Sequence, residues 1–362
     1  MQGKVITVLA RPNLALVKYW GKREKGKDCK YTSLNLPQNS SLSITLDAGE
    51  ELLTRTSVVF SEKLAQDTFY LNGKKQDMKS PELKERFLAI EELRKLSGVG
   101  TRALIVSNNS FPTASGLASS ASGLAALTFA ASKALGLKID SNKLSEITRI
   151  GSGSACRSLF GGFVVWNRGK LPDGSDSVAR QVFDEYYWPE LTTLICMTTR
   201  EKKKISSRAG MRQTVATSEL YKLRPDIAEE HVKEIIKALN KKDFEALARV
   251  TMADAMNMHS VMLDTRPPII YLNDVSKEVI YAVEDLNESE KRLVAAYTFD
   301  AGPNACVICA ESDADKVFAK LKGVRGIEKI LKAKIGSSPK VLSDSESLIN
   351  PKTLEPKFAL EK

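Results

Sequence analysis

Histidine and cysteine are scarce in this sequence of 362 residues, and each scarcity excludes a class of site. Only two histidines occur, His231 and His259, so a catalytic design that depends on imidazole is not expected; both lie in helical patterns typical of structural or surface roles. The five cysteines are odd in number and widely spaced, which excludes a secreted disulfide framework and fits a reducing compartment. Cys306 and Cys309 spell C-x-x-C inside an apolar run, which indicates a buried strand rather than a zinc or redox site.

Signals for secretion, membrane insertion and nucleic-acid binding are also absent from the sequence. The first residues show neither the apolar core nor the cleavage site of a secretory signal, so we expect a cytoplasmic protein. The apolar stretch 114–137 is rich in serine and contains Lys133, which favours a buried helix over a membrane span. The formal net charge is +10, yet the lysines are dispersed and no RNP-type pattern occurs. We therefore expect neither a membrane nor a nucleic-acid partner, and a basic RNA-binding protein is the alternative from a different class.

Composition and length predict a globular chain of two domains. Hydrophobic residues make up 43% of the sequence and charged residues 27%, which is the usual balance of a packed protein. The segment 185–190 interrupts the pattern of elements, so we place an N-terminal domain at 1–187 and a C-terminal domain at 188–362. Strands and helices are interspersed without a regular βαβ rhythm, which favours an α+β fold.

Hydrophobic periodicity predicts the individual elements. Apolar runs indicate strands at 5–10, 41–46, 68–71, 102–108, 162–166, 191–198, 294–299 and 304–310. Asn72-Gly73, directly after the third of these runs, indicates a hairpin with a type I′ turn. Helical spacing predicts helices at 81–96, 144–150, 225–240, 243–259, 273–287 and 314–322, and a further helix of small residues that ends near Leu135.

A loop rich in proline, glycine and serine, residues 111–124, leads into that helix of small residues. Such a loop leaves backbone N–H groups unpaired at the positive end of the helix dipole, which suits a phosphate. The hydroxyls of Ser115, Ser119 and Ser120 add donors or a ligand for Mg²⁺. No Gly-Lys-Ser/Thr follows the glycines, so this is not a Walker A loop. A Ser/Ala-rich turn before a buried helix is the structural alternative.

Two further segments combine glycine with fixed cations. The segment 11–23 carries Lys18 and Lys22, which together could clamp a diphosphate or a small carboxylate, or could be surface lysines at a strand end. The segment 150–162 is a second Gly/Ser loop before a short helix, and its Arg157 suits a bidentate carboxylate contact. A tight structural turn is the alternative for that loop.

The remaining two segments carry an acid and a basic cluster. Asp300 stands between an apolar strand and a Gly-Pro turn, where it is either a turn residue or a carboxylate presented to a cleft. Taken alone, turn chemistry explains this aspartate fully, so the turn interpretation is favoured there. The segment 202–211 holds three consecutive lysines, then Ser207 and Arg208 at a helix start. It is either a third phosphate contact or a solvated run of charges.

Together these segments resemble the mevalonate diphosphate decarboxylases, in the superfamily of galactokinase, homoserine kinase, mevalonate kinase and phosphomevalonate kinase. The element Pro-x-x-x-Gly-Leu-x-Ser-Ser at 112–120 marks only the superfamily. Lys-Tyr-Trp-Gly-Lys at 18–22, Gly-Ser-Gly-Ser-Ala-Cys-Arg at 151–157 and Phe-Asp-Ala-Gly-Pro-Asn at 299–304 are specific to the decarboxylases. The similar segments span 10–305, and none of these motifs departs from the family pattern.

The resemblance implies an enzyme that uses ATP and Mg²⁺ to convert (R)-5-diphosphomevalonate to isopentenyl diphosphate, CO₂, ADP and phosphate in the mevalonate pathway of isoprenoid and sterol biosynthesis. It implies an N-terminal domain like ribosomal protein S5 domain 2, a C-terminal ferredoxin-like α/β sandwich domain, and an active cleft between them. It also implies a homodimer. The near alternatives are a related small-molecule kinase that stops at phosphorylation, and a decarboxylase that acts on phosphomevalonate.

The same resemblance implies roles for individual residues, which we state as hypotheses. The catalytic residues are Asp300 at the C3 hydroxyl, Arg157 at the carboxylate, Lys18 at the transferring phosphoryl group and Ser120 at the ATP phosphates and the metal. The substrate-binding residues are Tyr19, Trp20, Gly21, Lys22, Ser152, Gly153, Ser154, Ala155, Cys156, Arg157, Ser207 and Arg208. The ATP-binding residues are Asn108, Ser115, Gly116, Leu117, Ala118, Ser119 and Ser120, with Ser120 as the metal ligand.

Overall fold

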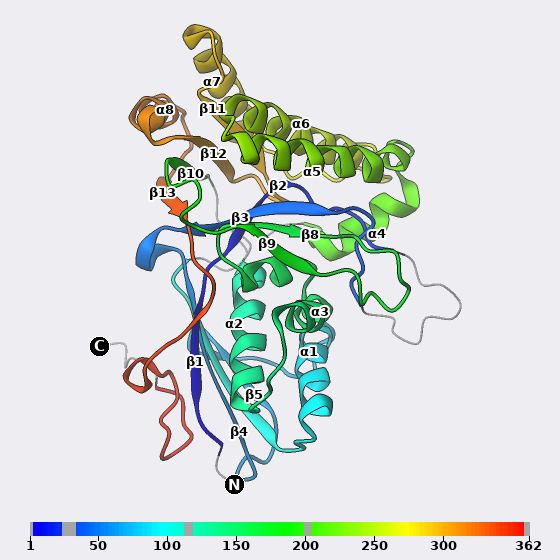
Figure 1. Ribbon diagram of the computed structural model, residues 1–362, viewed down its shortest axis with the longest axis vertical. Helices are drawn as coiled ribbons and strands as arrows, with labels where there is room; N and C mark the ends of the chain where they lie inside the picture. Colours follow the sequence, from blue (N-terminus) through cyan, green and yellow to red (C-terminus); the bar gives the residue numbers. More distant parts are fainter. Residues whose placement is uncertain (1–2, 24–33, 112–118, 199–203, 358–362) are drawn as a thin grey trace.

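A computed structural model describes residues 3–23, 34–111, 119–198 and 204–357 of the chain. The chain forms two β-sheets, each with helices packed against it, so the fold is a mixed α/β arrangement of two parts (Figure 1). The predicted strands and helices are confirmed within one to four residues at their ends. None of the helices in the described ranges combines the length and apolar character that a membrane crossing needs.

The first sheet fills the lower half of Figure 1 and has six strands. In order across the sheet they are β14 (Lys340–Val341), β1 (Ile6–Ala10), β4 (Thr54–Ser61), β7 (Arg102–Asn109), β5 (Thr68–Leu71) and β6 (Lys74–Lys75). Three helices pack beside this sheet around one apolar core, namely α1 (Pro81–Ser97), α2 (Ser119–Ala134) and α3 (Ser141–Gly151). The predicted hairpin is confirmed, because Asn72 and Gly73 have φ of 47° and 76°, as a type I′ turn requires.

The second sheet crosses the middle of the molecule and unites strands from both halves of the sequence (Figure 1). Its path is β11 (Ala295–Phe299), β12 (Ala305–Ala310), β10 (Leu191–Met197), β13 (Lys329–Ile335), β3 (Ser41–Asp47), β8 (Phe163–Trp166) and β9 (Ala179–Phe183), with β2 (Asn13–Val17) on β3. The halves join where β13 pairs with β3, at Lys334 opposite Asp47. Cys306 and Cys309 are buried in β12, which confirms the predicted strand.

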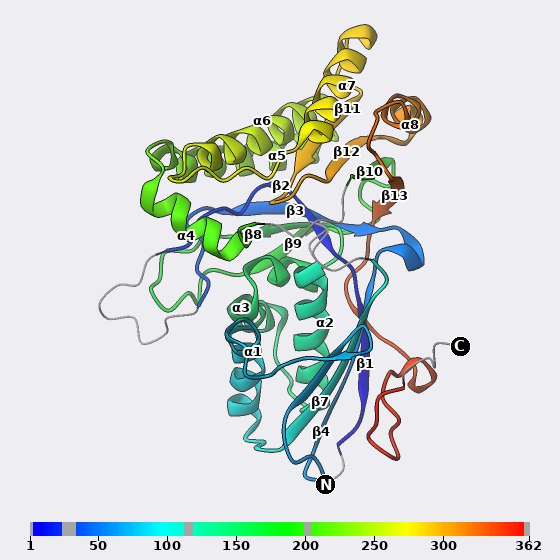
Figure 2. The ribbon, with the colours of Figure 1, turned by 180° about the vertical axis from the view of Figure 1, so that it is seen from behind.

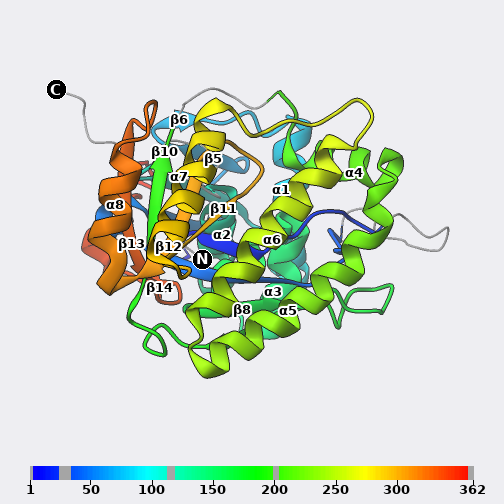
Figure 3. The ribbon, with the colours of Figure 1, turned by 90° about the horizontal axis from the view of Figure 1, so that it is seen from above.

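Helices of the second half cover the upper face of the second sheet (Figures 2 and 3). They are α5 (Arg224–Lys241), α6 (Phe244–Leu263), α7 (Asp274–Glu290) and α8 (Ala314–Lys322), while α4 (Ser207–Thr217) lies at one end of the sheet. A tight turn joins α5 to α6, and the two lie side by side in both views. Their apolar faces share one core with β3, in which Ile235 and Leu247 pack with Leu42.

The last described residues return to the first sheet. Strand β14 pairs with β1 through Val341 opposite Val8. Ile349 is fully buried in an apolar cluster that includes Val59 and Val106 of β4 and β7. Residues 340–357 therefore pack on the first part, although the chain boundary placed after residue 187 assigns them to the second.

Candidate active site

A cleft of about 720 Å³ opens between the two parts. Its lining comes from both halves of the sequence. The first half contributes β2 and the residues that follow it, β5, β7, α1, α2 and the 3₁₀ helix at Gly153–Leu159, and the second half contributes α4, α6 and the turn after β11. The cleft therefore brings together residues of all five sequence segments singled out above, with Gly123 and Leu124 as the lining residues from 111–124. The predicted site residues that line it are Lys18, Tyr19, Trp20, Lys22, Ser152, Gly153, Ser154, Arg157, Ser207, Arg208 and Asp300.

An ion pair between Lys18 and Asp300 lies at the centre of this lining. Strand β2 ends at Val17, so Lys18 is the first residue beyond the ladder, and its Nζ lies 2.8 Å from Oδ1 of Asp300. The same ammonium donates to the carbonyl of Ala15 at 2.7 Å. The Lys18 side chain is 2% exposed and that of Asp300 31%, so the lysine is fixed while the carboxylate faces the cleft. Asp300 also serves the turn, since its carbonyl accepts from Gly302 N at 2.7 Å.

The guanidinium of Arg157 is buried in a shell of neutral oxygens. Its Nη1 donates to Ser41 Oγ at 2.7 Å, its Nε to Ser43 Oγ at 3.1 Å and its Nη2 to Asn13 Oδ1 at 3.1 Å. It also lies over the ring of Trp166, 5.9 Å from the centroid. Burial lowers the pKa of Arg157, which Asp300 partly offsets. Within the described ranges this cation makes no ion pair, so its charge is directed at the cleft it lines.

A second group of cations lies at the α4 end of the cleft. Arg208 donates to the carbonyl of Gly151 at 3.0 Å and forms an ion pair with Glu85 of α1, across the opening. Burial, with the charges of Arg208 and Arg212, lowers the pKa of Lys22 to about 7. Like charges this close make it less favourable for each group to carry its charge, unless an anion binds among them. This corner therefore suits a ligand with several negative charges.

Tyr19 lines the cleft near the same cations. Its ring packs edge-on against Trp166, with centroids 4.7 Å apart, and its buried Oη has no partner among the described residues. Burial raises the pKa of Tyr19, so the phenol stays protonated and can donate. Gly153 makes room for this ring, because a Cβ there would lie 2.7 Å from Tyr19 and 2.8 Å from Trp166.

Three of the predicted substrate-binding residues lie behind the lining and support it. Ala155 and Cys156 are fully buried, and the Cys156 thiol donates to the carbonyl of Gly153 at 3.0 Å. Burial raises the pKa of Cys156 to about 11, so this thiol is structural rather than nucleophilic. Gly21 has φ of 107°, and a Cβ there would collide with Tyr221, whose Oη donates to the carbonyl of Trp20 at 2.8 Å.

The predicted nucleotide loop falls mostly outside the described residues. Ser115, Gly116, Leu117 and Ala118 lie there, and the side chains of Ser119 and Ser120 are likewise not described. Helix α2 begins at Ser119, so its N-terminal backbone N–H groups follow this loop directly. Asn108 is exposed and does not line the cleft, whereas its neighbours Ser107 and Asn109 on β7 do. Strand alternation explains this, because adjacent residues point to opposite faces.

Asn13 is a site residue that sequence reasoning missed. Its Nδ2 donates to Ser158 Oγ at 2.7 Å and to the carbonyl of Ser154 at 3.1 Å, while its Oδ1 accepts from Arg157. It thus joins the 11–23 segment to the second Gly/Ser loop. Its position in that segment, directly after Arg11-Pro12, was the available signal. Neither histidine lines the cleft; burial, with the charge of Lys18, lowers the pKa of His259 to about 4, which fits the structural role predicted for it.

The cleft offers few protein ligands for a metal among the residues that the structure describes. There, no group of three or more His, Cys, Asp or Glu side chains could hold a metal ion.

Comparison with known proteins agrees with this geometry. The family model "Diphosphomevalonate decarboxylase-like N-terminal domain" matches residues 10–179, and "Mevalonate 5-diphosphate decarboxylase C-terminal domain" matches 193–357. The diphosphomevalonate decarboxylase of Candida albicans is 42% identical over 94% of this chain and 98% of its own length.

Solved structures of the same kind share the fold. The mevalonate diphosphate decarboxylase from Trypanosoma brucei superposes with a TM-score of 0.86 at 34% identity, over 96% of this chain and all of the other (100%). A structure described as "MDDEF in complex with MVAPP, AMPPCP and Magnesium" has a TM-score of 0.82 at 34% identity, over 93% of this chain and 98% of that one. The chain therefore belongs to the diphosphomevalonate decarboxylase family.

Proposed function

We propose that this chain converts (R)-5-diphosphomevalonate and ATP to isopentenyl diphosphate, CO₂, ADP and phosphate, a step of the mevalonate pathway. Family membership supports this activity. The observation that carries it is the Lys18–Asp300 ion pair, 2.8 Å long, in a cleft that also holds the buried cation Arg157. The substrate has a carboxylate at C1, a tertiary hydroxyl at C3 and a diphosphate at C5, and we assign a group of that cleft to each.

Asp300 acts at C3 of the substrate in this proposal. Its carboxylate orients or accepts the proton of the C3 hydroxyl while that oxygen attacks the γ-phosphorus of ATP, whose bond to the bridging oxygen breaks as ADP leaves. The C3–O bond then breaks and phosphate leaves with the electron pair, so positive charge grows at C3 beside the carboxylate. The bond from the chain to CO₂ breaks last, and its electrons form the alkene. Lys18 offsets the charge on the transferring phosphoryl group and holds Asp300.

Arg157 binds the carboxylate that is lost as CO₂, since a guanidinium fork matches the two oxygens. The diphosphate binds at the opposite end, between Lys22 and Arg208 with Ser154 beside them. The buried Oη of Tyr19 supports this placement, because it lacks a partner among the described residues and lines the cleft there.

ATP binds at the N-terminus of α2 in this proposal, through the loop 112–120 and the N–H groups that open the helix. We assign Ser120 as the hydroxyl that this chain offers to Mg²⁺, with the phosphates as the other ligands. The metal, when bound, supplies charge neutralisation at the phosphates. The relative solved with AMPPCP and magnesium supports the use of ATP and Mg²⁺, while the placement at this loop and at Ser120 rests on the family motif.

We also propose the finer description of the assembly. Residues 1–187 form the ATP-binding domain, like ribosomal protein S5 domain 2, and 188–362 form a ferredoxin-like domain, of which residues 340–357 pack back on the first sheet. The two family models, which end and start at residues 179 and 193, support the division. A homodimer follows from the family resemblance, and sedimentation of the purified protein tests it. The cytoplasmic location stays a prediction.

The experiment that tests the activity offers the purified protein ATP, Mg²⁺ and either the monophosphate or the diphosphate of (R)-mevalonate. We expect CO₂ from the diphosphate alone. CO₂ from the monophosphate would establish the phosphomevalonate decarboxylase alternative, and ADP without CO₂ would establish a kinase.

A further inference from the structure

We infer that Asp254 and Arg224 are positioning residues, which clamp the peptide backbone of Lys18 and so set the geometry of its ion pair with Asp300. This inference deepens the proposed function and rests on it. Neither residue lines the cleft. Both act through Lys18, which is 236 positions away from Asp254 in the sequence.

The clamp holds both polar groups of Lys18's backbone. The backbone N–H of Lys18 donates to Oδ2 of Asp254 at 2.6 Å. Its carbonyl accepts from Nη2 of Arg224 at 2.9 Å and from Nδ2 of Asn39 at 2.9 Å. Lys18 stands just beyond the end of β2, next to a register shift between Ala15 and Val17, so the sheet does not fix its position. Hydrogen bonds from the side chains of Asp254, Arg224 and Asn39 hold this backbone instead of the hydrogen bonds of the sheet.

Asp254 and Arg224 form a fully buried ion pair of two contacts, 2.6 Å and 3.0 Å long, with both side chains 0% exposed. His231 Nδ1 lies 2.8 Å from Oδ1 of Asp254, and Arg224 also donates to Asn257 at 2.9 Å. Burial acts to raise the pKa of Asp254, but Arg224, His231 and the Lys18 N–H together hold it below its usual value. The carboxylate therefore stays ionised and keeps its hold on Lys18.

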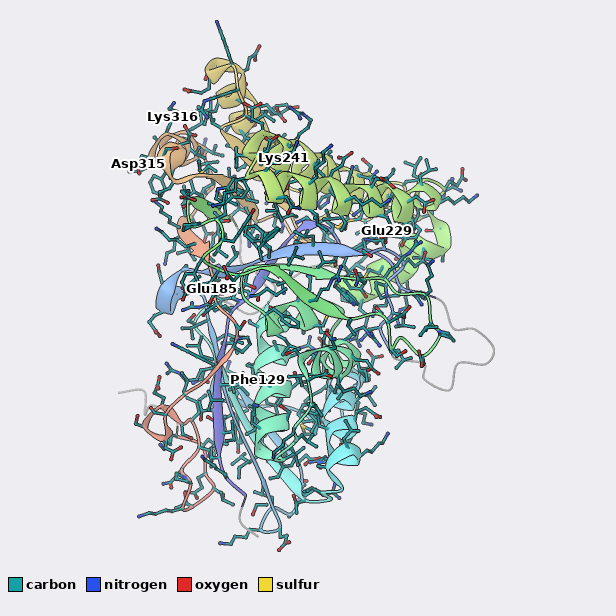
Figure 4. All side chains as sticks on the ribbon, in the orientation of Figure 1. Phe129, Glu185, Glu229, Lys241, Asp315 and Lys316 are labelled. Carbon is teal, nitrogen blue, oxygen red and sulfur yellow. The ribbon has the colours of Figure 1, made fainter. Side chains whose placement is uncertain are left out.

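The clamp also connects the two halves of the sequence. Arg224 and Asp254 come from α5 and α6 of the second half, as does Asp300, whereas Lys18 follows β2 in the first half. Glu229 of α5, labelled in Figure 4, adds a contact of the same kind, since it accepts from the backbone N of Ser40 at 2.7 Å. One pair of helices, α5 and α6, thus fixes where the lysine from the first half of the sequence meets the carboxylate from the second half.

A buried ion pair is by itself weak evidence for stability, because the cost of desolvating two charges can exceed their attraction. The presence of the Arg224–Asp254 pair is explained if the pair fixes the backbone of Lys18, which hydrophobic side chains in its place could not do. Catalysis is sensitive to such geometry, since displacing a reacting group by about 1 Å can cost about 100-fold in rate.

The test compares Asp254→Asn and Arg224→Lys with the matched control Asp67→Asn. Asp67 resembles Asp254 closely, because it accepts from both Nη atoms of Arg94 and from the backbone N of Ala103 at 2.8 Å, yet it lies outside the cleft lining. Steady-state kcat and KM for both substrates are measured beside the melting temperature. We expect D254N and R224K to lower kcat by about 10- to 100-fold. Both KM values should stay within about twofold, and D67N should keep its kcat while its melting temperature falls.

A double-mutant cycle with Lys18→Met separates positioning from general stability. If Asp254 acts through Lys18, adding D254N to K18M slows the enzyme no further. Additive losses, or a kcat loss in D67N as large as that in D254N at equal melting temperature, would overturn the inference. Arg224→Lys keeps the buried positive charge, so this variant is used in place of D254N if D254N does not fold.

The wild-type assay is evaluated first, so that the two claims fail separately. Absence of CO₂ from the wild type refutes the proposed function alone. The clamp is then judged by the rate of reductive methylation at Lys18, followed by mass spectrometry. Lys18 is buried in the wild type, so methylation should accelerate in D254N or R224K and not in D67N; equal rates in all would refute the clamp.

Discussion

Replacement of Asp300 by asparagine tests the chemistry most sharply, because it preserves shape and removes one charge. The Asp300 carboxylate is about one-third exposed, at 31%, so an effective dielectric near that of a protein surface applies. Two unit charges about 4 Å apart then interact by about 4 kcal/mol. If C3 carries nearly a full positive charge in the transition state at that distance, losing the carboxylate raises the barrier by about 4 kcal/mol and lowers kcat about 1,000-fold.

The assay is steady-state release of ADP and CO₂ by Asp300→Asn, with KM determined for both substrates. We expect KM to change little, because the lost interaction is made mainly in the transition state. Asp47→Asn is the matched control, since Asp47 is 33% exposed and pairs with Arg11 at 2.6 Å outside the cleft lining. A kcat for D300N within tenfold of the wild type, or an equal loss in D47N, would refute the reasoning.

Three further predictions follow from the cleft. Arg157→Lys keeps the charge but loses the fork that reaches Asn13 and Ser41, so KM for the mevalonate substrate should rise and kcat fall; unchanged kinetics would exclude the bidentate contact. Lys22, with a pKa of about 7 in the empty cleft, is a cation below that pH and neutral above it, so KM for the diphosphate substrate should rise between pH 6 and pH 8. Lys22→Met should flatten this rise, and a rise that persists would assign it to another group. Ser120→Ala should weaken ATP use, and unaltered KM for ATP together with unaltered kcat would show that the loop assignment is wrong.

Elements with strong periodicity or specific turn chemistry were predictable from the sequence. Helices α1 and α5 to α8 agree with their predicted spans, and the Asn72-Gly73 turn has the backbone that these residues favour. Strand β4 was not predicted, because its threonines and serines resemble a loop. In the fold these hydroxyls pair inside the sheet, for example Thr56 with Ser107 at 2.8 Å. Such pairing depends on a partner strand far along the chain, and no local pattern reveals it.

Some residues of the candidate site were likewise predictable from the sequence, and others were not. Motifs identified Lys18, Arg157 and Asp300, and the structure brings all three to one cleft. Asp254 and Arg224 were missed because each looks like an ordinary charge on an amphipathic helix. Their importance lies in contacts to a backbone more than 200 positions away, as the separations of 236 and 206 residues show. The ATP-binding role of Asn108 stays a prediction, because most of the neighbouring nucleotide loop lies outside the described residues.

The measurement that tests the central claim most directly is the simultaneous release of ADP and CO₂ from (R)-5-diphosphomevalonate, ATP and Mg²⁺ by the wild-type protein and by Asp300→Asn. The account predicts equal amounts of both products from the wild type and neither at an appreciable rate from the variant. ADP without CO₂ from the wild type, or equal turnover by both proteins, would contradict it.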